Sequence, residues 1–453
     1  MTKMKNQPPL PLNITMKPEN SGNTVLFQKI LFPYFLVLAL LAISGFEYIY
    51  RADKYIVPVL LVLMWMLGDK SLRNKNVKRF LWLATPFWTQ LILNNLLFQR
   101  YSVIANIVFF IFYFFLVQIV KKDFWRYYVN TLTFFAAISL LFYSLQITDN
   151  HHWILENISP YFESLNVDKS SDDFARMDGR YEYFRPNIMI YRFMIEDSIR
   201  NSGPFSEPGL FAGFLALALF IQCVVNAGSL FSPKSLLLTA TILTTVSTTG
   251  YLMLMAIYLF YFTQGKNLLL KVIAIPAMVC IAAIAYTQLD FLGEKIHEQS
   301  QMVGTGEKEE YRMGAFSVHL EMISSSPLVG FDHNLYEQYT DALSLSNGIT
   351  KVFVIHGIPV GFYYYFLLFF ACRNMMVYHG GSKFTTYTFF LLLLCFAFAQ
   401  SVTTRHFYYF LIFLGLLAYP HWKTQTGGLV ARWRIARKHH LPYDYSTNNE
   451  YSE

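Results

Sequence analysis

The sequence predicts an all-α polytopic membrane protein with about twelve transmembrane helices and two long loops outside the membrane. Three observations support this fold class. The mean hydropathy is +0.34, and 54% of the residues are apolar whereas only 14% are charged. Soluble domains carry roughly 25% charged residues. The apolar residues form long blocks, and acidic and basic residues gather in different connections between those blocks. This composition excludes a disordered chain and a disulfide-stapled secreted domain.

Blocks of about 20 apolar residues are long enough to cross a membrane as helices. The candidate blocks are 29–48, 55–68, 79–98, 101–119, 127–147, 208–226, 269–287, 352–372, 384–402 and 406–420. A further stretch, 236–263, is compatible with one long helix or with two short helices broken near Thr249-Gly250. Residues 1–28 are polar and hold no cleavable signal peptide, so the first block is expected to act as the insertion signal.

The distribution of charge favours two helices in 236–263. The connections 149–207 and 290–350 contain 21 of the 29 carboxylates but only 9 of the 36 Lys and Arg residues. The short connections 68–79 and 120–126 are basic, and short basic loops remain in the cytoplasm. Both long loops can then lie outside the cytoplasm only if 236–263 crosses twice. The expected parts are a cytoplasmic tail (1–28), a transmembrane domain (29–420) and a basic cytoplasmic tail (421–453).

The first long loop ends in a segment with regularly spaced charges. Arg192, Glu196 and Arg200 recur every four residues, which predicts one charged stripe on an amphipathic helix ending at Asn201-Ser202-Gly203. The stripe is either a solvated or lipid-headgroup face or a docking site for phosphate, which arginine binds through two parallel hydrogen bonds. Glu207 precedes a proline at the start of the next apolar block, a pattern typical of a helix start. Glu207 is therefore either a helix cap or a general base.

The second long loop contains a predicted helix that begins near Arg312 and ends at Ser326-Pro327. Arg312 is the only arginine among the ten carboxylates of this loop. His319, His333 and His356 are each either structural or available for acid–base chemistry. The hydroxyl-rich run from Thr239 to Thr249 is expected to pack between helices.

Four sequence elements resemble the O-antigen polymerase and O-antigen ligase superfamily of bacterial envelope glycosyltransferases. They are RNSGPFSEPGLFAGFLALALF (200–220), the Thr/Ser-rich stretch (239–250), YRMGAFSVHLEMISSSPLVGF (311–331) and SNGITKVFVIHGIPVGF (346–362). The resemblance covers residues 180–420. It implies a fold similar to the class C glycosyltransferases and a transfer of glycan from undecaprenyl pyrophosphate, without metal or cofactor, at the periplasmic face of the inner membrane.

The ligases of this superfamily carry a histidine, then Asn, Ser or Gln, and a glycine after nine further residues. The matching positions here are Ser346, Asn347 and Gly357, so serine replaces the histidine, which favours a polymerase. By the resemblance the family's arginines fall on Arg200 and Arg312, which we expect to contact the pyrophosphate. Glu207 is the expected base, with His356 and His319 as alternatives. The expected substrate-binding residues are Arg185, Arg192, Asp332, His333 and Asn347.

The resemblance also sets the expected partners. They are a lipid-linked glycan donor and acceptor, within surrounding membrane lipids, and the product is O-antigen, capsule or exopolysaccharide. Candidate protein partners are a chain-length regulator and a flippase; no nucleic acid is expected. The alternatives are a ligase that transfers glycan to lipid A-core and a lipid-linked oligosaccharide transporter. A transporter needs charges within its spans, whereas Glu47, Arg100 and Arg405 lie at the outer ends of the predicted spans.

Overall fold

A computed structural model describes most of the chain between residues 31 and 419. The described residues are 31–46, 49, 53–67, 76–98, 103–158, 190–193, 199–226, 228–264, 312–332, 335–336, 338–339 and 347–419. The predicted tails 1–28 and 421–453, the predicted span 269–287 and much of both long loops lie outside these residues.

The regular structure of the described residues is helical, and Phe46 and Phe205 form an isolated β-bridge. The N-terminal helices are α2 (Phe32–Gly45), α3 (Asp53–Leu67), α4 (Val77–Phe98), α5 (Val103–Val120), α6 (Phe124–Ile147) and α7 (His152–Asn157), with the short turn η4 (Lys121–Asp123). The later helices are α10 (Pro208–Val224), α11 (Pro233–Thr244), α12 (Thr248–Gln264), α15 (Arg312–Ser325), α17 (Gly348–Tyr378), α18 (Lys383–Ala399) and α19 (His406–Phe413), which continues into η6 (Leu414–Ala418). Every predicted span that falls within the described residues coincides with a helix. The all-α prediction is confirmed for this part of the chain.

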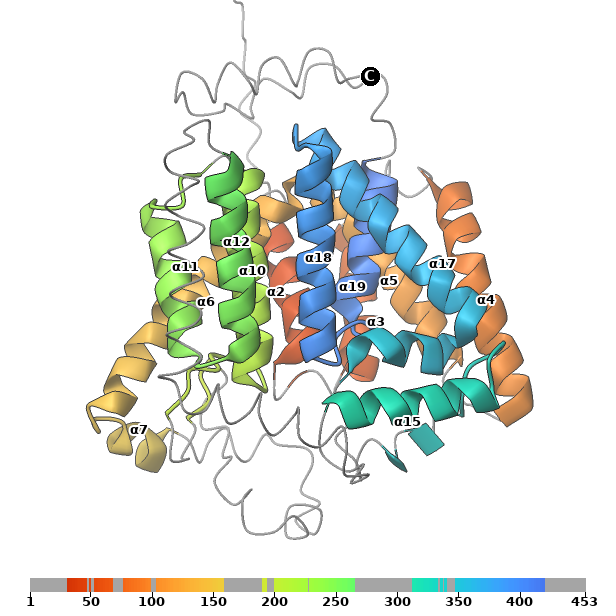
Figure 1. Ribbon diagram of the computed structural model, residues 1–453, viewed down its shortest axis with the longest axis horizontal. Coiled ribbons are helices and arrows are strands. Elements are labelled where there is room, and N and C mark those ends of the chain that lie inside the picture. The colour runs from red at the N-terminus through yellow and green to blue at the C-terminus, as the bar shows by residue number, and fades with distance from the viewer. Residues whose placement is uncertain are drawn as a thin grey trace, which may run out of the picture.

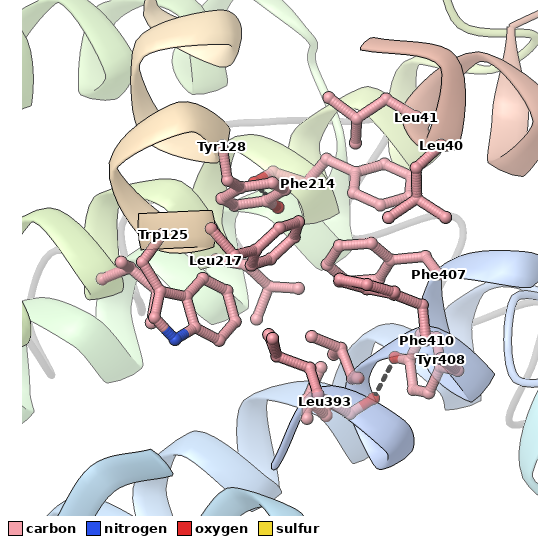
Figure 2. Close-up of a cluster of buried hydrophobic side chains, with 14 of the residues drawn as sticks. Leu40, Leu41, Trp125, Tyr128, Phe214, Leu217, Leu393, Phe407, Tyr408 and Phe410 are labelled. Carbon is pink, nitrogen blue, oxygen red and sulfur yellow. Dashed lines mark hydrogen bonds between the residues drawn. The ribbon is translucent and has the colours of Figure 1, made fainter. Parts of the chain in front are cut away.

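Most of these helices run side by side, and α15 lies across their lower ends (Figure 1). Helix α10 lies in the middle of this bundle: it packs against α6, α11, α12 and α18, and nearly all of its residues are buried. Large aromatic side chains fill the space around it. Figure 2 shows Trp125, Tyr128, Phe214 and Phe407 gathered between helices from both halves of the sequence. The Tyr128 hydroxyl donates a hydrogen bond to the Phe214 carbonyl oxygen at 2.9 Å, so the polar end of the ring is also satisfied.

The stretch 236–263 forms two helices, as the charge distribution predicts, but the break comes earlier than Thr249-Gly250. Helix α11 ends at Thr244, and Val246 adopts a φ of 46° in the turn. The Thr245 hydroxyl donates to the Ile242 carbonyl oxygen at 2.7 Å and so closes the last turn of α11. Gly250 lies where α12 packs closely against α10, and not in the turn between α11 and α12. A Cβ at this position would lie 2.7 Å from the Cβ of Ala212 in α10.

Helix α17 is bent within its first three turns. Gly357 has φ 73° and ψ 170°, and Pro359 follows two residues later. Only glycine adopts this backbone without strain, and a Cβ there would lie 2.5 Å from the Leu328 carbonyl oxygen. The residues before the bend therefore run alongside α15, and the residues after it join the bundle (Figure 1).

Two helical stretches, Val103–Ile147 and Gly348–Tyr378, are long and apolar enough to cross a membrane. The first is divided at Lys121, whose φ is 45°, into α5 and α6. Large apolar side chains also point outward from several helices, among them Trp65, Trp82, Leu96, Leu141, Phe362 and Phe366. A surface of this kind is compatible with an association with a membrane.

Candidate functional site

Four helices, α10, α12, α17 and α19, begin at one end of the bundle, the lower end in Figure 1. Their starts are joined through short contacts. A Cβ at Gly209 in α10 would lie 2.6 Å from the Gln400 side-chain nitrogen and 3.4 Å from the Ser247 hydroxyl. A Cβ at Gly348 in α17 would lie 2.5 Å from the Gln400 carbonyl oxygen. We call this region the loop end. The helix starts bring partial positive charge to it, which favours anions.

Glu207 occupies the N-cap position of α10, as the sequence pattern predicts, and Pro208 is the first helical residue. The backbone of Glu207 is extended, with φ −142° and ψ 143°, and its side chain makes no capping hydrogen bond. The carboxylate is exposed at the loop end. Of the two interpretations of Glu207, this geometry disfavours the cap and leaves the carboxylate accessible to a bound substrate.

The amphipathic helix predicted over the charged stripe is wrong at both of its ends. Arg192, Phe193, Ile199 and Arg200 are not helical, and residues 194–198 lie outside the described part of the chain. The backbone N–H of Arg192 donates to the Gly203 carbonyl oxygen at 2.9 Å, so the segment is held as a loop. Tyr191 and Phe193 are fully buried in a small apolar cluster. Tyr191 and Phe193 are both buried, and burial of every second residue is typical of an extended chain. This burial, and not the four-residue spacing of the charges, determines the local structure.

Both arginines of this segment reach the loop end. An Nη atom of Arg192 donates to the Ser206 carbonyl oxygen, next to Glu207. The Nε of Arg200 donates to the Thr245 carbonyl oxygen at 3.3 Å, in the turn between α11 and α12. Both side chains are half-buried. The two predicted phosphate ligands therefore lie beside the starts of α10 and α12.

Arg405, the N-cap residue of α19, is a third arginine at the loop end. Its Nη1 donates to the Ser44 carbonyl oxygen at 3.1 Å, and the neighbouring Gly45 carbonyl oxygen accepts from the Ser206 N–H at 3.0 Å. Arg192 and Arg405 thus flank the contact between residues 45 and 206. In the sequence, Arg405 is a lone cation at the outer end of a span, and this signal alone does not place it among the predicted site residues.

Asp53, His406 and Tyr113 form a hydrogen-bonded chain that the sequence analysis missed. The Nε2 of His406 lies 2.8 Å from Asp53 Oδ2, and its Nδ1 lies 2.7 Å from the Tyr113 hydroxyl. His406 and Tyr113 are buried, whereas the Asp53 side chain is 26% exposed. No short-range pattern relates Asp53 to His406, because 353 residues separate them.

His319 is buried between α15 and α17, with both ring nitrogens in contact with hydroxyl groups. Nδ1 lies 2.6 Å from Thr350 Oγ1, and Nε2 lies 3.3 Å from the Tyr336 hydroxyl. Burial and the nearby Lys351 ammonium lower the pKa of His319 to about 4. The ring is therefore neutral at pH 7 and joins α15 to the start of α17. This position favours the structural interpretation of His319.

Acidification is expected to weaken the attachment of α15 to α17. An unfolded chain protonates His319 below about pH 6.5, whereas the folded protein resists protonation down to about pH 4. The stabilisation contributed by neutral His319 is therefore fully present above pH 6.5 and is lost as the pH falls towards 4. About 2 kcal/mol of the free energy of unfolding is lost by pH 5. Thermal unfolding in detergent at pH 7.5 and pH 5.0 measures this loss of stability. The difference between the two pH values should be smaller in the His319→Gln variant than in the wild type. An equal loss in the variant would assign the pH dependence to other groups.

His356 is also buried, one residue before the bend of α17. Its Nδ1 lies 3.0 Å from the Gln90 side-chain oxygen of α4, and its Nε2 lies 2.5 Å from the Tyr409 hydroxyl of α19. The Gln90 side-chain nitrogen donates to the Val329 carbonyl oxygen at 2.6 Å. His356 thus ties three helices together, and this arrangement favours packing over proton transfer.

The other predicted site residues are less fully described. Asn347 is buried at the N-cap of α17, where its side-chain oxygen accepts from the backbone N–H groups of Ile349 and Thr350 at 3.0 and 3.3 Å. Asp332 is half-buried after the α15 helix. Helix α15 begins at Arg312, as predicted, but the side chain of Arg312 lies outside the described part of the structure. Arg185 and His333 lie outside it altogether.

Three buried hydroxyl groups at the loop end make no hydrogen bond within the described part of the chain. They belong to Ser202, before α10, to Thr248, at the start of α12, and to Ser401, between α18 and α19. A buried polar group without a partner costs about 1–3 kcal/mol, and a polar ligand that bonded to these three hydroxyls would remove that cost.

Comparison with family models and with curated proteins finds no match to this chain.

Proposed function

We propose that this protein polymerises oligosaccharide repeat units carried on undecaprenyl pyrophosphate. In this proposal it is a multi-pass protein of the bacterial inner membrane with about twelve spans and a fold similar to the class C glycosyltransferases. The loop end faces the periplasm. The outward-facing apolar side chains and the acidic composition of both long loops support this placement.

The observation that carries the proposal is the collection of anion-binding groups at the loop end. Arg192 and Arg200 approach it from the segment before α10, Arg405 approaches it from the N-cap of α19, and the helices α10, α12, α17 and α19 begin there. The three hydroxyls without partners add donors and acceptors suited to sugar hydroxyl groups. Planar guanidinium groups match the geometry of phosphate, and together with the helix starts they suit a lipid-linked pyrophosphate.

The proposed reaction is a displacement at the anomeric carbon of the donor glycan. A hydroxyl oxygen of the acceptor sugar forms the new glycosidic bond, and the bond from the anomeric carbon to the pyrophosphate oxygen breaks. The arginines stabilise the negative charge that develops on the leaving pyrophosphate. The acceptor hydroxyl gives its proton to Glu207, whose carboxylate is exposed beside the Ser206 carbonyl oxygen that holds Arg192. The partly exposed Asp53, paired with His406, is the second candidate base.

Deletion of the gene, followed by gel analysis of surface glycan, tests the proposed function. A polymerase mutant retains a single repeat on lipid A-core, and the wild-type gene restores the ladder. Complete absence of repeats would instead indicate a ligase, and an unchanged ladder on every surface polysaccharide would exclude both activities. Purified protein in vesicles should lengthen lipid-linked repeats without any other protein.

The expected topology places α7 and α15 in the periplasm and the turns before α6 and α18 in the cytoplasm. Single cysteines at Glu156 and Ser324 should react with a membrane-impermeant thiol reagent in intact spheroplasts. Cysteines at Lys122 and Lys383 should react only after the membrane is opened. All four positions are exposed, and the native cysteines are first replaced. Labelling of all four positions in intact spheroplasts would contradict the topology.

A further inference from the structure

A second group of polar side chains lies where α6 ends and α7 begins. Asp149, His151 and His152 place three ligand atoms within 4.8 Å of one another. The Asp149 Oδ1 lies 2.9 Å from His152 Nε2 and 3.8 Å from His151 Nδ1. The two imidazole rings are stacked, with their centroids 4.7 Å apart. Three ligand atoms of two types that transition metals accept, one carboxylate oxygen and two imidazole nitrogens, therefore lie close together around a single turn.

The backbone and the packing fix this turn. Asp149 has a φ of 58°, a left-handed conformation that aspartate tolerates better than most residues. The Asn150 N–H donates to the Leu145 carbonyl oxygen at 2.9 Å and anchors the turn to α6. The His151 ring stacks on Phe193 at 5.6 Å and its side chain is only 12% exposed. The backbone of the turn and the His151 ring are therefore held before any ion binds, whereas the Asp149 and His152 side chains are 78% and 62% exposed.

His151 provides the second, independent indication of a ligand. Its Nδ1 is buried and makes no hydrogen bond within the described residues, although it faces the Asp149 carboxylate. His151 contributes one of the three atoms that lie within 4.8 Å of one another, so it is placed to act as a ligand. A neutral imidazole is the form that binds a metal ion.

We propose that Asp149, His151 and His152 bind one Zn²⁺ ion through one oxygen and two nitrogen atoms. Zinc bonds to histidine and carboxylate are about 2.0–2.1 Å long in tetrahedral sites, which places neighbouring ligand atoms about 3.3 Å apart. The observed separations of 2.9 and 3.8 Å lie on either side of that value. The third separation, between the two histidine nitrogens, is within 4.8 Å. Three protein ligands leave the fourth position of the ion for water or for another oxygen ligand.

The site has a direct structural link to the loop end. His151 stacks on Phe193, which follows Arg192 in the chain, and Arg192 donates to the Ser206 carbonyl oxygen. A bound ion holds His151 in place and so restrains the segment 191–193 against α6 and α7. This metal site does not depend on the proposed polymerase activity, and its occupancy is measurable without any glycan substrate.

Zinc binding to the full-length protein in detergent, prepared without a polyhistidine tag, tests the proposal. We expect one Zn²⁺ per chain by isothermal titration, and Co²⁺ in its place should give the visible absorption of a four-coordinate site. Asp149→Asn keeps the left-handed turn, and His151→Phe keeps the stacking on Phe193, so both variants should fold. Each of these, and His152→Ala, should weaken binding by at least about tenfold.

Glu156→Gln is the matched control, because it removes an exposed carboxylate from α7, near the three ligands but not among them. It should bind zinc as tightly as the wild type. A triple variant of Asp149, His151 and His152 measures binding to the other histidines of the chain. If this variant binds zinc with the same stoichiometry and affinity as the wild type, the site does not exist. Absence of tight binding in the wild type would overturn the proposal equally.

Discussion

Glu207→Gln is expected to lower polymerisation by about 10²–10⁴-fold while the protein folds and binds its lipid-linked substrate normally. The reason lies in the helix start. The Glu207 side chain makes no capping bond, so neither the start of α10 nor its packing depends on the carboxylate charge. Loss of a working cap costs about 1 kcal/mol, and even that cost is not expected here. Elongation of lipid-linked repeats in vesicles, normalised to folded protein, measures the effect.

Glu321→Gln, which changes another exposed carboxylate on the same side of the bundle, serves as the control and should retain full activity. A well-folded Glu207→Gln protein with near-normal polymerisation would remove Glu207 from the reaction. The role of base would then pass to Asp53, and Asp53→Asn should abolish activity. The two candidate bases can be tested independently, because Glu207 precedes α10 whereas Asp53 is the first residue of α3.

Arg200→Lys and Arg405→Lys are each expected to reduce polymerisation by about 10²-fold or more, nearly as strongly as the Ala variants. Lysine keeps the positive charge but loses the planar, forked donor group that matches phosphate. Each arginine also holds a backbone carbonyl oxygen, Thr245 and Ser44 respectively, in a geometry that the Nζ of lysine does not reproduce. Length distributions of the glycan ladder and rates in vesicles provide the measurement.

Arg373→Lys is the matched control, because Arg373 lies near the opposite end of α17 and contacts the Phe370 ring. It should leave the ladder unchanged. Full ladders from both Lys variants at the loop end would reduce Arg200 and Arg405 to a general electrostatic role. Normal ladders from the corresponding Ala variants would exclude them from the site.

The helices could be predicted from the sequence where local chemistry decides them. Apolar blocks mark the spans, and the proline after Glu207 marks the start of α10. The charge asymmetry of the connections predicts two helices in 236–263. The turn between α11 and α12 was predicted near Thr249-Gly250, because glycine often marks a break in a helix, but it follows Thr244. Gly250 is small because α12 packs closely against Ala212 of α10. A single sequence does not distinguish these two uses of glycine.

The site was only partly predictable, because much of it comes from contacts between distant segments. Arg192 and Arg200 were predicted to share a stripe on a helix, but their own segment does not form that helix; Arg192 reaches Ser206 and Arg200 reaches Thr245 from a loop. The burial of Tyr191 and Phe193 against α6 and α7 determines that segment. The pairing of Asp53 with His406 depends on how α3 and α19 lie in the bundle, and nothing near either residue indicates it.

The central position of α10 has a consequence for the order in which the protein is assembled. Ribosomes make α10 about midway through synthesis, yet one of its faces is covered by α18, which begins 175 residues after α10 begins (208 to 383). Gly213 remains uncovered until the Phe396 ring arrives beside it. The start of α10 likewise gains its neighbour Gln400, and Arg405, only at that stage. A nascent or truncated chain therefore holds Glu207 without its surroundings, and the loop end becomes complete only when synthesis is almost finished.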